Sequence, residues 1–168
     1  MAFVFKAKID NVAAVMRKLE GLRKGVQNRI VRPAITKASR VVRAEAKRRA
    51  PKDTGALRRS LAAVVRVGRR TGNVYAVIGP ETGVKRNKKT GETSATGFGK
   101  WLAKKGLSDS VSPAHTAHFS ELGTAHEPPR PWLRPALAAT RQEVGAIIRN
   151  EIRAGLAKYH ERQRQRAK

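Results

Sequence analysis

A helix-forming segment between residues 29 and 50 carries hydrophobic residues on one side and basic residues on the other. With roughly 3.6 residues per turn, spacings of three and four place one apolar stripe on Ile30, Ala34, Ala38, Val41, Val42 and Ala46. The opposite side carries Arg29, Arg32, Arg40, Arg43 and Lys47. Such a helix has to pack its apolar stripe against a core, and it leaves a basic surface for water or for an anionic partner.

This basic surface is nearly free of acidic residues, since Glu45 is the only acid between Glu20 and Asp53. A run of charge is usually a solvated helix face, which is the first interpretation. A solvated face normally mixes both signs, because opposite charges three or four residues apart stabilise a helix. The single sign favours contact with a phosphate backbone or an acidic protein surface. The sequence leaves both interpretations open.

The composition sets the class of the chain. It has 168 residues, with 37 Lys and Arg against 12 Asp and Glu, a net charge of +25 and no Cys. The length fits one domain with a tail, and the regular aliphatic spacing excludes disorder of the whole chain. The lack of Cys excludes disulfides, thiolate metal sites and a cysteine nucleophile. No run approaches the roughly 20 apolar residues of a membrane span, so we expect a soluble protein made in the cytoplasm.

Hydrophobic periodicity predicts the secondary structure of the first half. Alternation indicates a strand at 3–9, and steps of three and four indicate a helix from residue 12 to residue 30. Pro33 should end or kink this helix, because proline lacks an N–H and its ring clashes with the preceding turn. A second helix is expected from Pro33 to Pro51, followed by a β-hairpin with strands at 61–67 and 74–78.

The second half is less regular. Residues 80–112 are expected to form a long mobile loop with a short helical turn at 98–104 and a basic cluster of Lys85, Arg86, Lys88 and Lys89. Its Phe98 and Trp101 either stack on nucleic-acid bases or anchor the loop to the domain. A strand is expected at 114–123. A last helix from near Pro135 should bury Leu137, Thr140, Val144, Ile147 or Ile148, Glu151 or Ile152, and Leu156. We expect one domain over 1–159 and a fraying basic tail at 160–168.

A search for catalytic and metal-binding patterns finds none that is specific. His115, His118, Glu121 and His126 offer ligand types, but in a strand residues 115 and 118 face opposite sides and cannot share an ion easily. No pair of carboxylates lies in an apolar setting, and no glycine-rich phosphate loop is present. We therefore expect a protein without a catalytic site, a metal or a cofactor.

Two motifs carry the strongest signal. The first runs from Ala50 to Leu61 and contains Pro51, Asp53, Thr54, Gly55, Leu57 and Ser60. The second contains Glu121, Gly123 and Thr124, followed by Pro131, Trp132, Leu133 and Pro135. Over roughly residues 10–155 their order and spacing resemble the neck and minor tail components of tailed bacteriophages, of the tail-completion type. In that family A-P-x-D-T-G-x-L-x-x-S precedes a hairpin, and E-x-G-T precedes P-F-L-R-P-A and a last helix; Trp132 stands where Phe is usual.

The resemblance implies an α+β fold, with an antiparallel β-sheet flanked by a long kinked N-terminal helix pair and a C-terminal helix, and with a long loop insertion. It implies a non-enzymatic virion protein, made in the host cytoplasm, that forms a ring of six copies at the head–tail junction. Its partners would be its own copies, neighbouring neck and tail proteins and the genome DNA that passes through the ring. The motif residues would be scaffold: Asp53–Gly55 a turn, Glu121–Thr124 a strand end with Gly123 at positive φ, and Trp132 a buried anchor.

The charge alone allows an alternative, a sequence-nonspecific DNA-binding protein that acts on free nucleic acid. Such a protein neutralises several phosphates, so its affinity for duplex DNA should fall steeply as the salt concentration rises.

Overall fold

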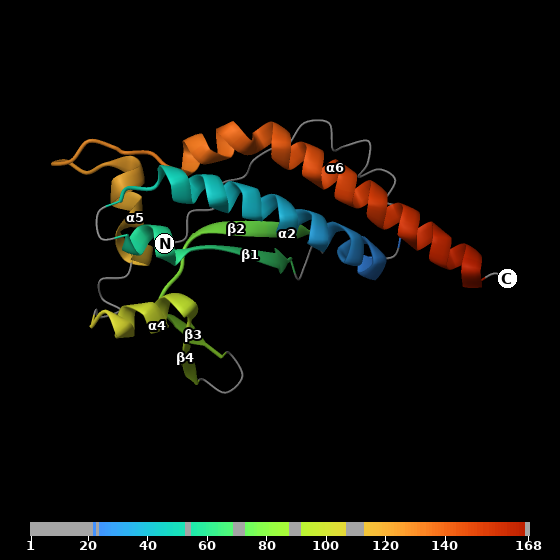
Figure 1. The fold of residues 1–168 in the computed structure, drawn as a ribbon, viewed down its shortest axis with the longest axis horizontal. Helices are drawn as coiled ribbons and strands as arrows, with labels where there is room; N and C mark the ends of the chain where they lie inside the picture. Colours follow the sequence, from blue (N-terminus) through green and yellow to red (C-terminus); the bar gives the residue numbers. More distant parts are fainter. Residues whose placement is uncertain are drawn as a thin grey trace. The chain divides into compact units, whose positions relative to one another are not determined.

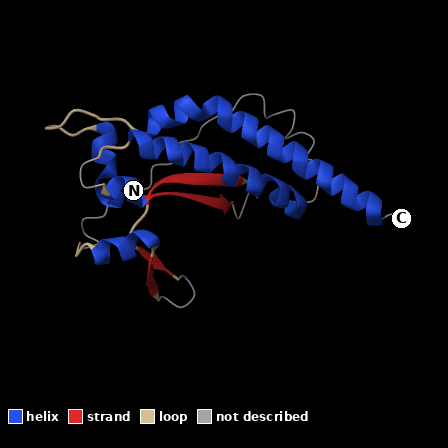
Figure 2. Ribbon diagram, viewed as in Figure 1, coloured by secondary structure: helices blue, strands red, loops and turns tan. Residues whose placement is uncertain are grey.

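The computed structural model describes residues 22, 24–52, 55–68, 73–87, 92–106 and 113–166. Figure 1 and Figure 2 show its helices and strands. In chain order these are α2 (Lys24–Arg49), α3 (Ala56–Ser60), β1 (Leu61–Val67), β2 (Val74–Pro80), β3 (Val84–Arg86), β4 (Thr93–Ala95), α4 (Gly97–Lys104), α5 (Pro113–Leu122) and α6 (Leu133–Arg166). The expected α+β class is confirmed, with antiparallel strand pairs between a long N-terminal and a long C-terminal helix.

The chain forms two compact units, and both long helices take part in each of them. Unit 1 comprises the described parts of 1–4, 43–62 and 78–137, and unit 2 the described parts of 5–42, 63–77 and 138–168. The strand expected at 3–9 and the helix expected to begin at residue 12 fall, up to residue 21, outside the described residues.

Helix α2 runs through Pro33 without ending there, so the expected division into two helices at this residue is wrong. Proline removes one helical hydrogen bond, the one to the carbonyl of Arg29, but its ring lies on the exposed side of α2. Ile30, Val31 and Ala34 on the other side are buried. Tertiary packing of this apolar stripe therefore holds the helix together across the proline.

In unit 2 the first part of α2 lies beside α6 (Figure 1). Lys37 makes an ion pair with Glu151 of α6, at 2.5 Å between Nζ and Oε1. Gly155 lies so close to Ile30 that an added Cβ would be 2.7 Å from its Cγ2 atom. Helix α6 buries Thr140, Val144, Ile148, Ile152 and Leu156, which confirms most of the expected core positions and decides for Ile148 and Ile152. Leu137 is only half-buried, so its expected burial is not confirmed.

Helix α6 is longer than expected at its C-terminal end. It continues to Arg166, where the sequence favoured a fraying tail from His160 onward. Residues 160–166 are exposed and gain little from packing. Their Glu, Arg and Gln side chains are good helix formers, which accounts for the extension without an apolar face.

The expected β-hairpin is confirmed, since β1 and β2 pair as a two-stranded sheet (Figure 2). At its far end the N–H of Gly68 donates to the carbonyl oxygen of Asn73 at 2.8 Å. At the other end the N–H of Glu81 donates to the carbonyl oxygen of Ser60 at 2.8 Å. This second bond ties the exit of β2 to the end of α3.

Residues 80–112 contain more secondary structure than the sequence indicated. Strands β3 and β4 form an antiparallel hairpin in which Val84 is opposite Ala95 and Arg86 is opposite Thr93. Strands of three residues, built from Thr, Ser and Lys as much as from apolar residues, show no alternation that could reveal them. Helix α4 confirms the helical turn expected at 98–104, and Thr96 caps it by accepting the N–H of Gly99 at 3.1 Å.

The strand expected at 114–123 is wrong, because this segment is helix α5. Pro113 occupies the first helical position, where a missing N–H costs nothing. Gly123 follows the last turn at φ 78°, and its N–H donates to the carbonyl oxygen of Phe119 at 2.7 Å. Pro113, Ala117 and Glu121 are buried at intervals of four residues. Because only Ala117 of these residues is a typical core residue, the sequence shows no hydrophobic period that could distinguish a helix from a strand here.

Candidate functional site

A buried carboxylate joins the end of α5 to the start of α6. Glu121 Oε2 accepts the backbone N–H of Trp132 at 2.8 Å and that of Leu133 at 2.9 Å, and Oε1 accepts the N–H of Arg134 at 3.0 Å. These N–H groups belong to the first turn of α6, which has no intrahelical acceptors for them. The negative charge also faces the positive end of the helix dipole. Glu121 is thus a helix cap supplied from 11 or more residues upstream.

The two sequence motifs meet in one hydrophobic core of unit 1. Trp132 is 2% exposed and packs in a cluster with Ala46, Ala50, Leu61, Ala117, Leu133 and Ala136, against which Leu57 and Ile78 also lie. Its indole Nε1 donates to the hydroxyl oxygen of Ser120 at 3.3 Å. The expectation that Trp132 is a buried anchor is confirmed. The end of the first motif and the proline-rich part of the second are therefore one packing unit.

The first motif connects the end of α2 to α3 and β1. Gly55 has φ 73°, a conformation that glycine adopts without strain, and it begins α3. Ser60 is fully buried, and its hydroxyl donates to the carbonyl oxygen of Leu57 at 2.9 Å. Pro51 is half-buried, while Asp53 and Thr54 lie outside the described residues.

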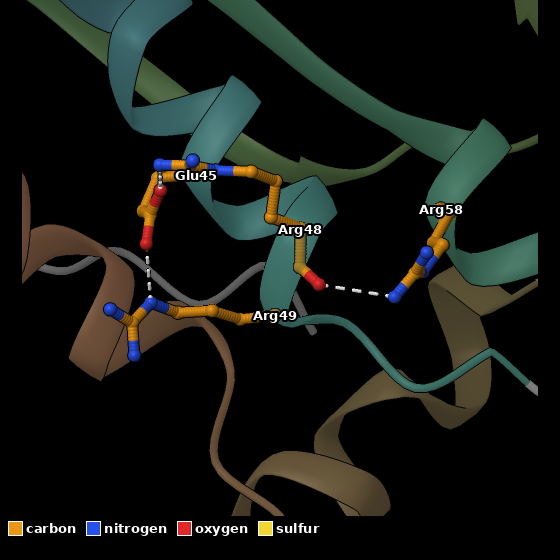
Figure 3. Close-up of polar contacts among 4 residues, drawn as sticks. All are labelled: Glu45, Arg48, Arg49 and Arg58. Atoms are coloured by element: carbon orange, nitrogen blue, oxygen red, sulfur yellow. Dashed lines mark hydrogen bonds and ion pairs between the residues drawn. The ribbon is translucent and has the colours of Figure 1, made fainter.

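Arg58 is a scaffold residue that the motif analysis missed. Its Nε donates to the carbonyl oxygen of Ala50 at 2.9 Å. Its Nη2 donates to the carbonyl oxygen of Arg48 at 3.0 Å, as Figure 3 shows. Both carbonyls lie at the C-terminal end of α2, where helical acceptors have no intrahelical donor. The guanidinium therefore caps α2 and suits the negative end of its dipole.

The loop between α5 and α6 is held by its own backbone contacts. A Cβ at Gly123 would lie 2.9 Å from the carbonyl oxygen of Glu127 and from the nitrogen of Pro129, so this position needs glycine for space as well as for its φ. Thr124 Oγ1 accepts the N–H groups of His126 and Glu127. Pro131 is exposed, and Pro135 lies half-buried in the first turn of α6. The expected strand end at Glu121–Thr124 is a helix end.

The basic surface of α2 is only partly as predicted. Arg29, Arg32 and Arg40 are exposed, whereas Arg43 and Lys47 are half-buried. Burial lowers the pKa of Lys47, and the neighbouring charges of Arg43 and Arg59 lower it further. Lys85 and Arg86 belong to strand β3, and Lys88 and Lys89 lie outside the described residues. Of the predicted set on α2, the three exposed arginines lie in unit 2, and the half-buried Arg43 and Lys47 lie in unit 1.

Glu45 does not neutralise this surface. It is 8% exposed and forms ion pairs with Arg48 and Arg49 at the end of its own helix, with 2.7 Å between Arg49 Nε and Oε1 (Figure 3). The hydrogen bond from Arg49, followed by that from Arg48, holds the pKa of the Glu45 carboxyl below its ordinary value. Glu45, the single acid between Glu20 and Asp53, thus pairs with two arginines that do not belong to the predicted basic surface.

An open groove of about 510 Å³ lies in unit 2 along the exposed part of this surface. We call it the α2 groove; it is lined by Asn28, Arg29, Arg32, Pro33, Thr36, Lys37, Arg40 and, from β1, Val67. None of these lining residues is acidic. The helical pattern in the sequence identified the arginines of this groove. It did not identify Asn28 or Lys37 as lining residues, because the sequence does not show that Val67, at the end of β1, lies beside this part of α2.

The structure also bears on two points of the sequence analysis, the histidines as metal ligands and the role of Phe98 and Trp101. In α5 residues 115 and 118 lie one helical turn apart, so the argument from opposite faces of a strand fails. Among the residues with a described placement, no group of three His, Asp or Glu could hold a metal ion. Phe98 is buried with Leu102 and Ala56, and Trp101 stacks on it at 5.7 Å between ring centroids. The aromatic pair anchors α4, which confirms that interpretation.

Within the described part of the chain, no helix is long and apolar enough to cross a membrane.

Comparison with known proteins gave one match. A family model described as "Bacteriophage HK97-gp10, putative tail-component" matches residues 13–123. Searches of curated proteins and of solved structures gave no match. The matched range includes α2 with its basic surface, the first motif and α5 with Glu121. Because it covers well over half of the 168 residues, the chain belongs to the HK97-gp10-like family of bacteriophage tail components.

Proposed function

We propose that this protein is a structural component of a tailed-phage virion, of the tail-completion or neck type, which forms a ring at the head–tail junction. The family match carries this proposal, since it spans the segment in which the first motif and the basic helix occur together. The protein would work in the neck or tail of the virion, in contact with neighbouring neck and tail proteins.

The buried polar groups support a structural role. The carboxylate of Glu121 accepts three backbone N–H groups, and Ser60 is bonded within its own turn. These groups stabilise the joints between α5 and α6 and between α3 and β1. A buried carboxylate whose two oxygens both accept backbone N–H groups stabilises the fold, as expected of a scaffold residue.

A ring follows from head-to-tail contacts between identical copies, because a heterologous interface closes when its rotation divides a full turn. We propose six copies and a central channel for the genome DNA. The basic residues would then meet DNA phosphates or acidic surfaces of adjoining ring proteins. The proposed contact set is Arg29, Arg32, Arg40, Arg43, Lys47, Lys85, Arg86, Lys88 and Lys89.

The crowding around Lys47 supports such a contact. Burial lowers its pKa first, and the like charges of Arg43 and Arg59 lower it further, so these cations repel one another in the free protein. A phosphate or carboxylate placed against them would relieve this repulsion.

The test is the composition of the particle. Virions purified through a density gradient should contain the protein in a fixed ratio to the portal protein, and deletion of its gene should leave DNA-filled heads without attached tails. Native mass spectrometry of the purified protein, alone and with its neck partners, should show a closed oligomer. Absence of the protein from infectious virions would overturn the proposal.

The net charge of +25 favours the alternative, a nonspecific binder of free DNA. That function requires duplex binding at physiological salt by a protein that stays outside the virion. Loss of binding near physiological salt, together with ring formation, would exclude it.

A further inference from the structure

We propose that the α2 groove is a binding site for the phosphate backbone of nucleic acid, formed by Arg29, Arg32, Arg40 and Asn28. The inference deepens the proposed function, because it selects one part of the predicted basic surface and one ligand chemistry. It rests on the arrangement of the lining residues within unit 2.

The three arginines of the α2 groove are spaced along one side of the helix. Arg29, Arg32 and Arg40 lie on one side of a continuous helix and line one groove. Their Cα positions extend over roughly 16 Å of helix axis, at about 1.5 Å per residue. One strand of duplex DNA presents roughly five phosphates over that length. A linear array of cations fits an extended polyanion better than a single compact anion.

Among the described residues, no acid forms an ion pair with these arginines. Lys37, Arg48 and Arg49 form ion pairs with Glu151 or Glu45, whereas Arg29, Arg32 and Arg40 take part in none of these pairs. Lys37 at the same groove is paired with Glu151, so we leave it out of the site. Three exposed guanidinium groups thus remain in a groove without acidic lining.

The remaining lining residues of the α2 groove distinguish nucleic acid from an acidic protein as its partner. Contacts to phosphates come from Arg and Lys together with neutral donors such as Asn, and the half-buried Asn28 adds an amide beside Arg29. Protein partners are usually held by an apolar or aromatic anchor in a desolvated pocket. The groove is open, and the hydrophobic residues in its lining are Pro33 and Val67, both of them exposed and neither aromatic. These features favour phosphates.

The test uses the purified full-length protein and a labelled mixed-sequence DNA duplex of about 30 base pairs. The groove variant is R29Q/R32Q/R40Q. The matched control is R153Q/R162Q/R164Q, which removes the same charge from three exposed positions of α6. We expect the groove variant to lose at least about tenfold in affinity and the control less than about threefold. The slope of log K against log salt should become shallower by roughly 2 to 3 in the groove variant alone, since each lost phosphate contact removes about 0.9.

A second measurement does not depend on the folding of any variant. Bound DNA should protect Arg29, Arg32 and Arg40 of the wild-type protein from modification by phenylglyoxal, mapped by mass spectrometry, and should leave Arg153 and Arg162 reactive. Equal losses in both variants, equal protection of both sets, or stronger binding of polyglutamate than of DNA would overturn the inference. Because this test needs no virions, it can fail while the protein is still found in the particle, and it can succeed even if the protein is absent from it.

Discussion

The carboxylate of Glu121 accepts the backbone N–H of Trp132 at 2.8 Å, and through this bond the end of α5 positions the first turn of α6. Trp132 in turn fills the core formed by the end of α2, the start of β1 and α5. One acid and one indole therefore connect two segments that the sequence presents as separate motifs.

Replacing Glu121 should destabilise unit 1 strongly. Glu121→Ala leaves three backbone N–H groups of α6 without their acceptor in a buried place, and we expect a loss of about 2 to 4 kcal/mol in the free energy of unfolding. Glu121→Gln keeps one acceptor oxygen and should lose less. Urea denaturation followed by circular dichroism measures the effect. Glu143→Gln, at an exposed position of α6, is the control and should change stability by less than about 0.5 kcal/mol. An equally small effect of Glu121→Ala would contradict the capping role.

Trp132→Ala should cost about 3 to 5 kcal/mol, because it removes a 2% exposed side chain from the centre of the core. Trp132→Phe keeps most of the apolar volume and loses only the bond to Ser120, so its effect should be clearly smaller. Chemical denaturation of both variants gives the comparison. A loss below about 1 kcal/mol for the alanine variant would mean that Trp132 is exposed and part of an interface.

Much of the fold could be predicted because long periodic stripes identify buried helices. The stripe from Ile30 to Ala46 and the one from Thr140 to Leu156 both lie in the core. Helix α5 is not evident from the sequence because, of its buried residues Pro113, Ala117 and Glu121, only Ala117 is a typical core residue, and one residue shows no period. Pro33 does not end α2, because the packing of the apolar stripe stabilises the helix and local propensity alone does not reveal that packing.

The candidate site shows the same limit. The arginines of α2 are visible from their helical spacing, yet the groove also needs Val67 of β1, which lies far along the sequence. The cap by Glu121 is equally hidden, since a normal helix cap lies next to the first turn and this one lies 11 residues before it. Contacts across the fold, and not the local pattern, determine both features.

Gly99 is expected to tolerate no side chain. A Cβ at this position would lie 1.9 Å from the carbonyl oxygen of Gly83, so the backbones of α4 and of the segment before β3 would have to separate. We expect Gly99→Ala to lower the free energy of unfolding by about 1 to 3 kcal/mol. Gly97→Ala, in the same helix with open space around it, is the matched control and should be neutral or slightly stabilising. Equal urea midpoints for the two variants would show that the segments are not in close contact.

The ion pairs of Glu45 should make stability depend on pH in acid. The folded protein holds the pKa of Glu45 below its ordinary value of 4.5, so its contribution is present above that pH and is lost as the pH falls through the folded value. Glu45→Gln should therefore be less stable than the wild type at neutral pH, and the difference should shrink at about pH 3. Urea midpoints at both pH values measure this. A difference that is the same at both would show that the ion pairs do not stabilise the fold.

Reversal of charge on α2 should separate folding from assembly. Arg40 is exposed, and Arg43 and Lys47 are half-buried but do not belong to the hydrophobic core. R40E/R43E/K47E should therefore keep the far-ultraviolet circular dichroism spectrum of the wild type. Phage carrying this variant should yield fewer infectious particles, with heads that release DNA or remain without tails, because the variant opposes an anionic surface with like charge. The same reversal at Arg153, Arg162 and Arg164 of α6 is the control, and it should assemble normally if contact is specific to α2. A variant that is unfolded would show that these positions belong to the core, and a variant that assembles normally would exclude the α2 surface from the proposed contacts.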